Sequence, residues 1–146
     1  MFKKFNHVSH IVKNLDEAIK MYSDILRISP WDVGVVTTKE VKLVWLPLGD
    51  NFIELMEPID SESRFARHLG EKGEGFFHIS VFADEYDTEI KALKEKGYKL
   101  DEESFMFGGV QARLAFLSPE QTKGAWIEIV DIAGMNLLSA SSEKSK

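Results

Sequence analysis

The sequence predicts an α+β protein made of two tandem β-α-β-β-β modules, the first over about residues 5–60 and the second over about 75–131. The segment Phe5-Asn6-His7-Val8-Ser9 returns as Phe76-Phe77-His78-Ile79-Ser80. A strand-like Ile-Glu pair follows each histidine after roughly fifty residues, and in both copies an alternating pattern gives way to a helical one. We therefore expect a duplicated half-domain inside a single domain spanning residues 1–138.

The first module begins with a strand and a helix. Alternating residues predict a strand over 7–12. Asn14, with Glu17 three residues later, is a typical start of a helix, and apolar residues at helical spacing run on to Leu26. Strand-like runs then follow at 31–37, 41–46 and 52–57, with Gly49-Asp50-Asn51 as the turn between the last two.

The second module repeats this order after a connecting segment. Residues 61–70 indicate a short capped helix and 71–75 a glycine-containing linker. The pattern over 84–96 predicts the second copy of the helix, which Gly97 ends. Strands are expected over 98–102, 110–117 and 125–130. The tail, 139–146, is small and charged, which predicts disorder.

Composition excludes several classes of function. The formal charge of −6 leaves no basic stripe for nucleic acid or an anionic membrane. The absence of cysteine removes disulfides, thiolate zinc sites and cysteine nucleophiles. The N-terminus lacks a signal-peptide pattern, and no apolar run reaches the length of a membrane span. We expect a soluble, cytoplasmic protein with a small-molecule substrate, no nucleic-acid partner and no membrane.

Two histidines and two glutamates occupy matched phases of the repeat: His7, Glu54, His78 and Glu128. Each glutamate lies in an apolar strand, where a buried carboxylate without a partner is costly. Two imidazoles and two carboxylates suit one divalent ion such as Zn, Co, Ni, Mn or Fe(II). The alternative is a pair of structural histidines with glutamates on a solvent-facing surface. Matched positions in both copies favour the metal site.

The same residues resemble a known family. The opening segment from His7 to Ala18, the repeated β-α-β-β-β order and the Ile-Glu strands are similar to the vicinal oxygen chelate superfamily, which includes glyoxalase I, bleomycin-resistance proteins and extradiol dioxygenases. The resemblance covers about residues 5–131. It implies a curved mixed sheet around one metal ion, with ligands at His7, Glu54, His78 and Glu128, and a homodimer.

Within the superfamily, the chain most resembles the methylmalonyl-CoA epimerases. The similar segments are 53–58, the Arg67-His68-Leu69 helix, 117–119 and 122–129. The chain lacks the Asp-Pro-Asp-Gly turn typical of glyoxalase I, and Ile11 stands where that enzyme often has an arginine. The resemblance implies a divalent-metal-dependent isomerase that removes a proton alpha to a thioester through a metal-stabilised enolate.

An epimerase also needs an acid or base on each side of its substrate. The resemblance assigns one role to Glu128, and it places the second at Lys42, where the family has a carboxylate. Glu40, two residues earlier, is an alternative base, and an exposed Glu40/Lys42 charge pair is the simpler reading. Arg113 either meets a substrate anion or forms a surface ion pair. A one-base, glyoxalase I-like lyase (lactoylglutathione lyase) and a non-catalytic binding protein of the same fold are the competing functions.

Overall fold

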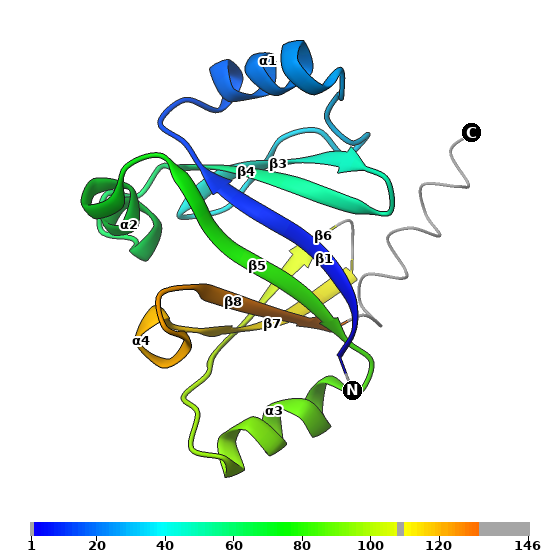
Figure 1. The fold of residues 1–146 in the computed structure, drawn as a ribbon, viewed down its shortest axis with the longest axis vertical. Helices are drawn as coiled ribbons and strands as arrows, with labels where there is room; N and C mark the ends of the chain where they lie inside the picture. Colours follow the sequence, from blue (N-terminus) through cyan, green and yellow to red (C-terminus); the bar gives the residue numbers. More distant parts are fainter. Residues whose placement is uncertain (1, 108–109, 132–146) are drawn as a thin grey trace. The chain divides into compact units, whose positions relative to one another are not determined.

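The computed structural model describes residues 2–107 and 110–131 (Figure 1). Its elements follow in the order β-α-β-β-β, a connecting helix, then β-α-β-β-β with a short helix before the last strand. Hydrogen bonds join the strands in the order β2-β3-β4-β1-β5-β8-β7-β6. The β1 and β4 strands are parallel and the β3–β4, β6–β7 and β7–β8 pairs are antiparallel, so the sheet is mixed. The predicted α+β class with two modules is confirmed.

Backbone contacts divide the chain into two units. One is His7–His78; the other takes the residues before His7 together with Ile79 onward. Because β1 and β5 are the strands that carry His7 and His78, each of them runs from one unit into the other. The single domain over 1–138 stays a prediction, and the predicted tail at 139–146 lies outside the described residues. Among those residues, no helix is both long enough and apolar enough to span a bilayer.

The His7–His78 unit contains most of the first module. Its elements are β1 (Phe2–Ile11, from His7 on), α1 (Leu15–Leu26), β2 (Val36–Thr37), β3 (Val41–Leu48), β4 (Asn51–Pro58), α2 (Arg64–Lys72) and the start of β5 (Gly75–Ala83). Figure 1 shows α1 lying over β3 and β4. Val44, Leu46 and Leu55 from these strands pack with Leu15 and Ala18 of the helix. This apolar face leaves the alternate residues, Glu54 among them, on the opposite face.

Local sequence signals set the ends of these elements. The Asn14 side chain accepts a hydrogen bond from the backbone N–H of Glu17 at 3.0 Å, so the predicted N-cap is confirmed. Ser63 caps α2 in the same way through the N–H of Ala66. The β3–β4 hairpin turns over two residues, since Leu48 pairs with Asn51 and Gly49 takes a φ of 63°.

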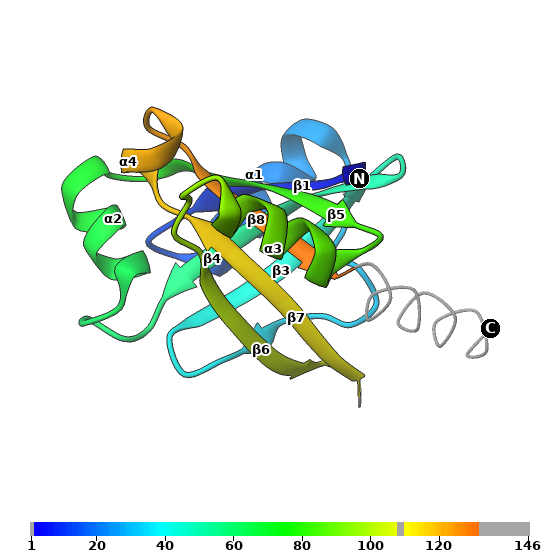
Figure 2. The ribbon, with the colours of Figure 1, turned by 90° about the horizontal axis from the view of Figure 1, so that it is seen from below.

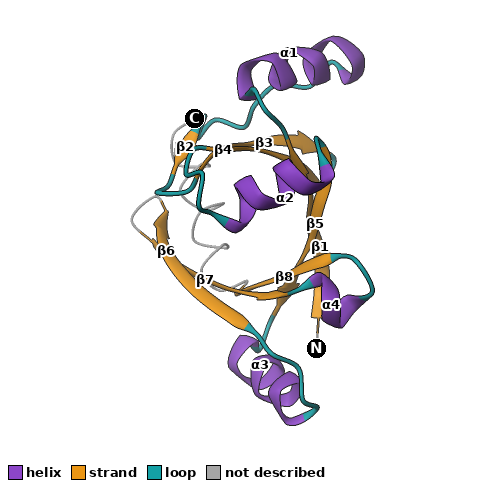
Figure 3. Cartoon of the chain, turned by 90° about the vertical axis from the view of Figure 1, so that its left-hand side faces the viewer, coloured by secondary structure: helices purple, strands orange, loops and turns teal. Residues whose placement is uncertain are grey.

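The other unit holds the second copy. Its elements are the end of β5, α3 (Tyr86–Glu95), β6 (Asp101–Phe107), β7 (Val110–Leu117), α4 (Pro119–Thr122) and β8 (Trp126–Asp131). Ala115, Leu117 and Ile129 pack with Tyr86 and Ile90 of α3, and this helix lies beside the strands of its unit in Figure 2 and Figure 3. The opposite face of β7 and β8 has its own apolar cluster: Leu114, Phe116, Val130, Phe82 and Trp126.

Two predicted strands are wrong in extent. The run over 31–37 forms a strand only at Val36–Thr37, because the N–H of Gly34 bonds back to the carbonyl of Trp31 in a turn. The run over 98–102 becomes a strand only at Asp101. The Gln121 side chain accepts from the N–H of Lys99 and donates to its carbonyl, which removes that residue from any ladder.

Candidate metal centre

Three of the four predicted ligands come together within the His7–His78 unit. His7 lies on β1, Glu54 on β4 and His78 on β5, and their ligand atoms all lie within 4.8 Å of one another. The Nε2 atoms of His7 and His78 are 2.8 Å apart. Glu54 Oε1 lies 3.5 Å from the first and 3.6 Å from the second. All three side chains are buried.

Strand pairing explains why these residues meet. The parallel β1–β4 register places Ser9 beside Glu54 and His7 beside Phe52. Adjacent residues on paired strands share a face, so His7, Ser9 and Glu54 point to one side of the sheet. Ser9 is small and fully buried. Its small size leaves room beside the His7 and Glu54 side chains.

The electrostatics of the cluster favour an ionised glutamate. Burial raises the pKa of the Glu54 carboxyl. The nearby His7 and His78, together with the hydrogen bond from the indole of Trp45, outweigh burial and lower that pKa to about 2. The site therefore holds a carboxylate beside two imidazoles at neutral pH.

Unsatisfied polar atoms show that a metal ion fits here. Glu54 Oε2 accepts from Trp45 Nε1 at 2.8 Å, but Glu54 Oε1 is buried without a hydrogen-bond donor among the described residues. The Ser9 hydroxyl, on the adjacent strand, is equally unsatisfied there. Buried polar atoms nearly always have hydrogen-bond or metal partners. A carboxylate oxygen facing two imidazole nitrogens is a ligand set that divalent metals accept.

Glu128 belongs to the other unit. It is buried on β8, opposite Phe116 of β7, and shares its face with Trp126. Because Ile127 and Ile129 pack toward α3, Glu128 lies on the face that α3 does not cover. Its place as the fourth ligand stays a prediction.

The structure does not bring Lys42 to the cluster. Lys42 is paired with Glu57 across the β3–β4 ladder and forms an ion pair with it at 3.2 Å. Glu57 also accepts a hydrogen bond from the N–H of Leu15, the first residue of α1. Because side chains alternate along a strand, Lys42 lies on the α1 side and Glu54 on the other. On the Glu54 side, the described part of β3 presents Val41, Leu43, Trp45 and Pro47.

Glu40 is not on a strand at all. It precedes β3, it is half-buried, and its carbonyl accepts hydrogen bonds from the N–H groups of Ile59 and Asp60. The same alternation that turns Lys42 away would apply to a residue two positions earlier. The ion pair that Lys42 forms is with Glu57 and not the predicted one with Glu40, and neither Lys42 nor Glu40 lies on the Glu54 face of β3.

Arg113 is already bound by protein carboxylates. Its guanidinium lies 2.6 Å from Asp131 and 2.8 Å from Asp87, and it stacks 4.8 Å from the ring centre of Tyr86. Hydrogen bonds to Asp87 and Asp131 raise the pKa of Arg113 further above its usual value. Since Arg113 and Phe116 are an odd number of positions apart, Arg113 lies on the α3 side, away from Glu128. This arrangement favours the ion-pair alternative.

The sequence interpretation missed Trp45 as part of the site. Trp45 pairs with Glu54 in the β3–β4 ladder, and its indole holds one oxygen of that carboxylate. The signal was present in the sequence. A two-residue turn at Gly49-Asp50 pairs Leu48 with Asn51, and counting outward from there places residue 45 opposite residue 54.

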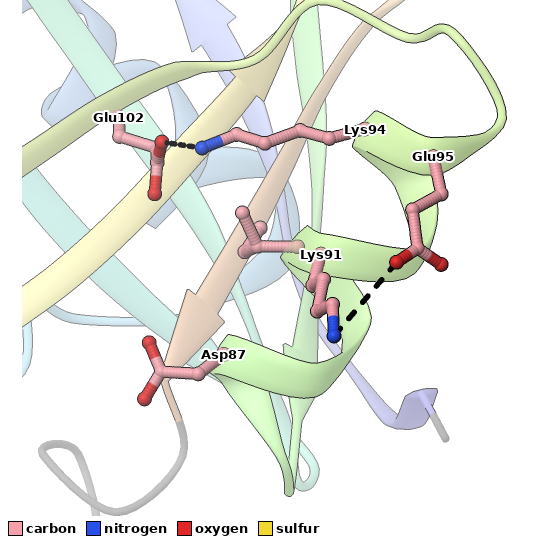
Figure 4. Close-up of a pocket in the computed structure, with 6 residues that line it drawn as sticks. Asp87, Lys91, Lys94, Glu95 and Glu102 are labelled. Carbon is pink, nitrogen blue, oxygen red and sulfur yellow. Dashed lines mark hydrogen bonds and ion pairs between the residues drawn. The ribbon is translucent and has the colours of Figure 1, made fainter.

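A surface pocket beside α3 has no cluster of metal-ligating side chains like that of His7, Glu54 and His78 among its described lining residues. Figure 4 shows its charged side chains, Asp87, Lys91, Lys94, Glu95 and Glu102. Asp87 pairs with Arg113, and the other four form two ion pairs. Lys94 bonds Glu102, and Lys91 lies 3.8 Å from Glu95. These are exposed ion pairs, which contribute little to binding or stability.

Comparison with known proteins agrees with the fold. Residues 6–116 match the family model of the Glyoxalase/Bleomycin resistance protein/Dioxygenase superfamily. The chain is 27% identical over 127 residues to the mitochondrial methylmalonyl-CoA epimerase of Bos taurus, covering 86% of this chain and 73% of that protein. It is 24% identical over 131 residues to the uncharacterized protein YqjC of Bacillus subtilis, covering 90% and 94%.

A solved structure extends the comparison. The crystal structure of methylmalonyl-CoA epimerase from Mycobacterium tuberculosis superposes with a TM-score of 0.78 at 25% identity, covering 89% of this chain and 88% of that one. The match thus includes both copies of the repeat. The chain belongs to the glyoxalase/bleomycin resistance protein/dioxygenase superfamily.

Proposed function

We propose that this protein is a divalent-metal-dependent isomerase that acts on a small acyl-CoA thioester in the manner of methylmalonyl-CoA epimerase. The observation that carries the proposal is the buried cluster of His7, Glu54 and His78, in which one carboxylate oxygen lacks a hydrogen-bond donor among the described residues. Similarity to methylmalonyl-CoA epimerases over most of the chain supports the reaction class.

The three clustered residues would hold the ion, with Glu128 as the proposed fourth ligand. A bound divalent ion supplies positive charge beside a substrate carbonyl oxygen and so increases the acidity of the neighbouring C–H group. Zn, Co, Ni, Mn and Fe(II) all accept this set of nitrogen and oxygen ligands.

The proton transfers fall to protein carboxylates. In the proposed reaction, Glu128 accepts the proton from the carbon alpha to the thioester. Its burial on β8 keeps competing water away from the carboxylate. Inversion of that carbon requires a second group that returns a proton to the opposite face of the substrate.

The β3 strand does not supply that second group from the Glu54 side. Leu43 and Trp45 occupy the positions nearest to Glu54, and Lys42 is turned to α1. This observation favours a second candidate, a one-base lyase of the glyoxalase I type, in which a single carboxylate removes and returns the proton on one side. The intact ligand cluster argues against a purely non-catalytic binding protein.

Isotope exchange separates the candidates. Metal-loaded protein is incubated with methylmalonyl-CoA in deuterated water, and in parallel with the hemithioacetal of methylglyoxal and glutathione. Deuterium at the alpha carbon together with inversion supports the isomerase. Turnover of the hemithioacetal without exchange into the thioester supports the lyase. Neither reaction, from protein that retains its metal, would contradict both.

A further inference from the structure

The two oxygens of Glu54 have different surroundings. Oε2 accepts from the indole Nε1 of Trp45 at 2.8 Å, whereas Oε1 faces the Nε2 atoms of His7 and His78. Every group in this arrangement is buried. A hydrogen bond to a charged acceptor away from water is among the stronger ones in proteins.

The indole itself is fixed in place by its neighbours. The backbone N–H of Trp31 donates to the backbone carbonyl of Trp45 at 2.8 Å. The two indole rings meet edge to face with their centres 6.3 Å apart. Trp31 also packs on Phe52, the residue two positions before Glu54 on the same strand face. The donor therefore approaches the carboxylate from one defined direction.

We propose that Trp45 is a positioning residue that makes Glu54 a one-oxygen ligand, holding Oε2 so that only Oε1 is presented between the two histidines. This inference rests on the metal centre of the proposed function. A partner that orients a ligating carboxylate typically changes metal affinity by about 10- to 100-fold when it is removed.

The second copy of the repeat has a phenylalanine at the position equivalent to Trp45. Phe116 pairs with Glu128 on the β7–β8 ladder, as Trp45 pairs with Glu54 on the β3–β4 ladder. A phenyl ring has no N–H to donate. The indole donor at the paired position of the first copy therefore has no equivalent at the paired position of the second.

Two substitutions separate the hydrogen bond from packing. Trp45→Phe removes the N–H but also some volume. Replacing Trp45 with benzothienylalanine, in which sulfur takes the place of the N–H, keeps the ring size. Tyr22→Phe is the matched control, because it removes a hydrogen-bonding group from an aromatic side chain of the same unit that contacts His10 instead of the cluster. Metal affinity is measured by titration of the metal-free protein with Co(II), and the visible d–d spectrum reports the coordination number.

We expect both variants at position 45 to bind Co(II) about 10- to 100-fold more weakly, with weaker and shifted d–d bands as the freed second oxygen joins the ion. Tyr22→Phe should stay within about twofold of the wild type. If the benzothienylalanine protein binds Co(II) like the wild type with an unchanged spectrum, the inference is overturned while the metal centre stands; this variant also decides if Trp45→Phe fails to fold. If the wild type itself retains no divalent ion, the proposed function and this inference fall together.

Discussion

The Nε2 atoms of His7 and His78 lie 2.8 Å apart, although each histidine opens a different copy of the repeat. Each lies inside a strand, and both strands run from one unit into the other. Equivalent positions of a duplicated sequence thus meet at one point, where Glu54 completes a group of three.

Removing one of these histidines should remove the metal. We expect His78→Ala to weaken divalent-metal binding by at least about 100-fold, since a direct ligand matters more than the outer partners that change affinity 10- to 100-fold. Metal content after dialysis, measured by mass spectrometry, tests this. His10→Ala is the control, because His10 bonds the hydroxyl of Tyr22 instead. Equal metal retention in both variants would contradict the site.

Lys42 should be dispensable for the reaction. Lys42→Ala breaks an ion pair with Glu57 on the α1 side, where a half-exposed pair is worth no more than about 1 kcal/mol. We expect metal affinity and turnover within about twofold of the wild type, whereas Glu128→Gln should abolish turnover. Steady-state kinetics on whichever substrate is active compares the two. A large loss in Lys42→Ala would restore it as a catalytic candidate.

The protein should lose stability as the pH falls below 6.5, in part through His10. Burial lowers the pKa of His10 in the folded protein, and the charge of Glu74 offsets this only partly. Below pH 6.5 the unfolded chain therefore binds a proton at His10 more readily than the folded chain does. The stability that neutral His10 contributes is intact above pH 6.5 and is lost as the pH falls. Urea unfolding across pH 5–8 should show a shallower slope for His10→Gln. An identical slope would mean that His10 titrates normally.

The interface between α1 and its strands should dominate the stability of that unit. Leu55 is fully buried against α1, and Leu55→Ala is expected to cost about 2–5 kcal/mol of unfolding free energy. Ile25 lies on the same helix but is 68% exposed, so Ile25→Ala should change stability by less than about 0.5 kcal/mol. Chemical denaturation of the metal-free proteins measures both. Similar losses would show that the helix packs differently.

Elements with strong local signals were predictable from the sequence. The Asn14 cap rests on a hydrogen bond between near neighbours, so its signal is local. The turn predicted at Gly49-Asp50-Asn51 is present but one residue shorter, since Asn51 already pairs with Leu48. The short extent of the strand within 31–37 was not predictable, because a local turn at Gly34 competes with the extended pattern. The backbone of Lys99 likewise stays outside the strand because it bonds the side chain of Gln121, a residue far along the chain.

Some site residues could likewise be identified from the sequence and others could not. Repetition identified His7, Glu54 and His78, since matched phases need no knowledge of distant contacts. Assigning a role to Lys42 required the exact register of one strand, and a shift of one residue moves a side chain to the opposite face. Leu43, its neighbour, is the residue on the Glu54 side.

The tight turn between β3 and β4 has a consequence for how this sequence can change. Gly49 and Asp50 are the whole of the connection between the paired residues Leu48 and Asn51, so they set the count that puts Trp45 opposite Glu54. One residue inserted between Trp45 and the turn would place a different side chain against the carboxylate and send the indole to the helix side. The length of this surface hairpin is therefore a chemical constraint, and natural insertions should accumulate in other loops, where no ligand depends on the number of residues.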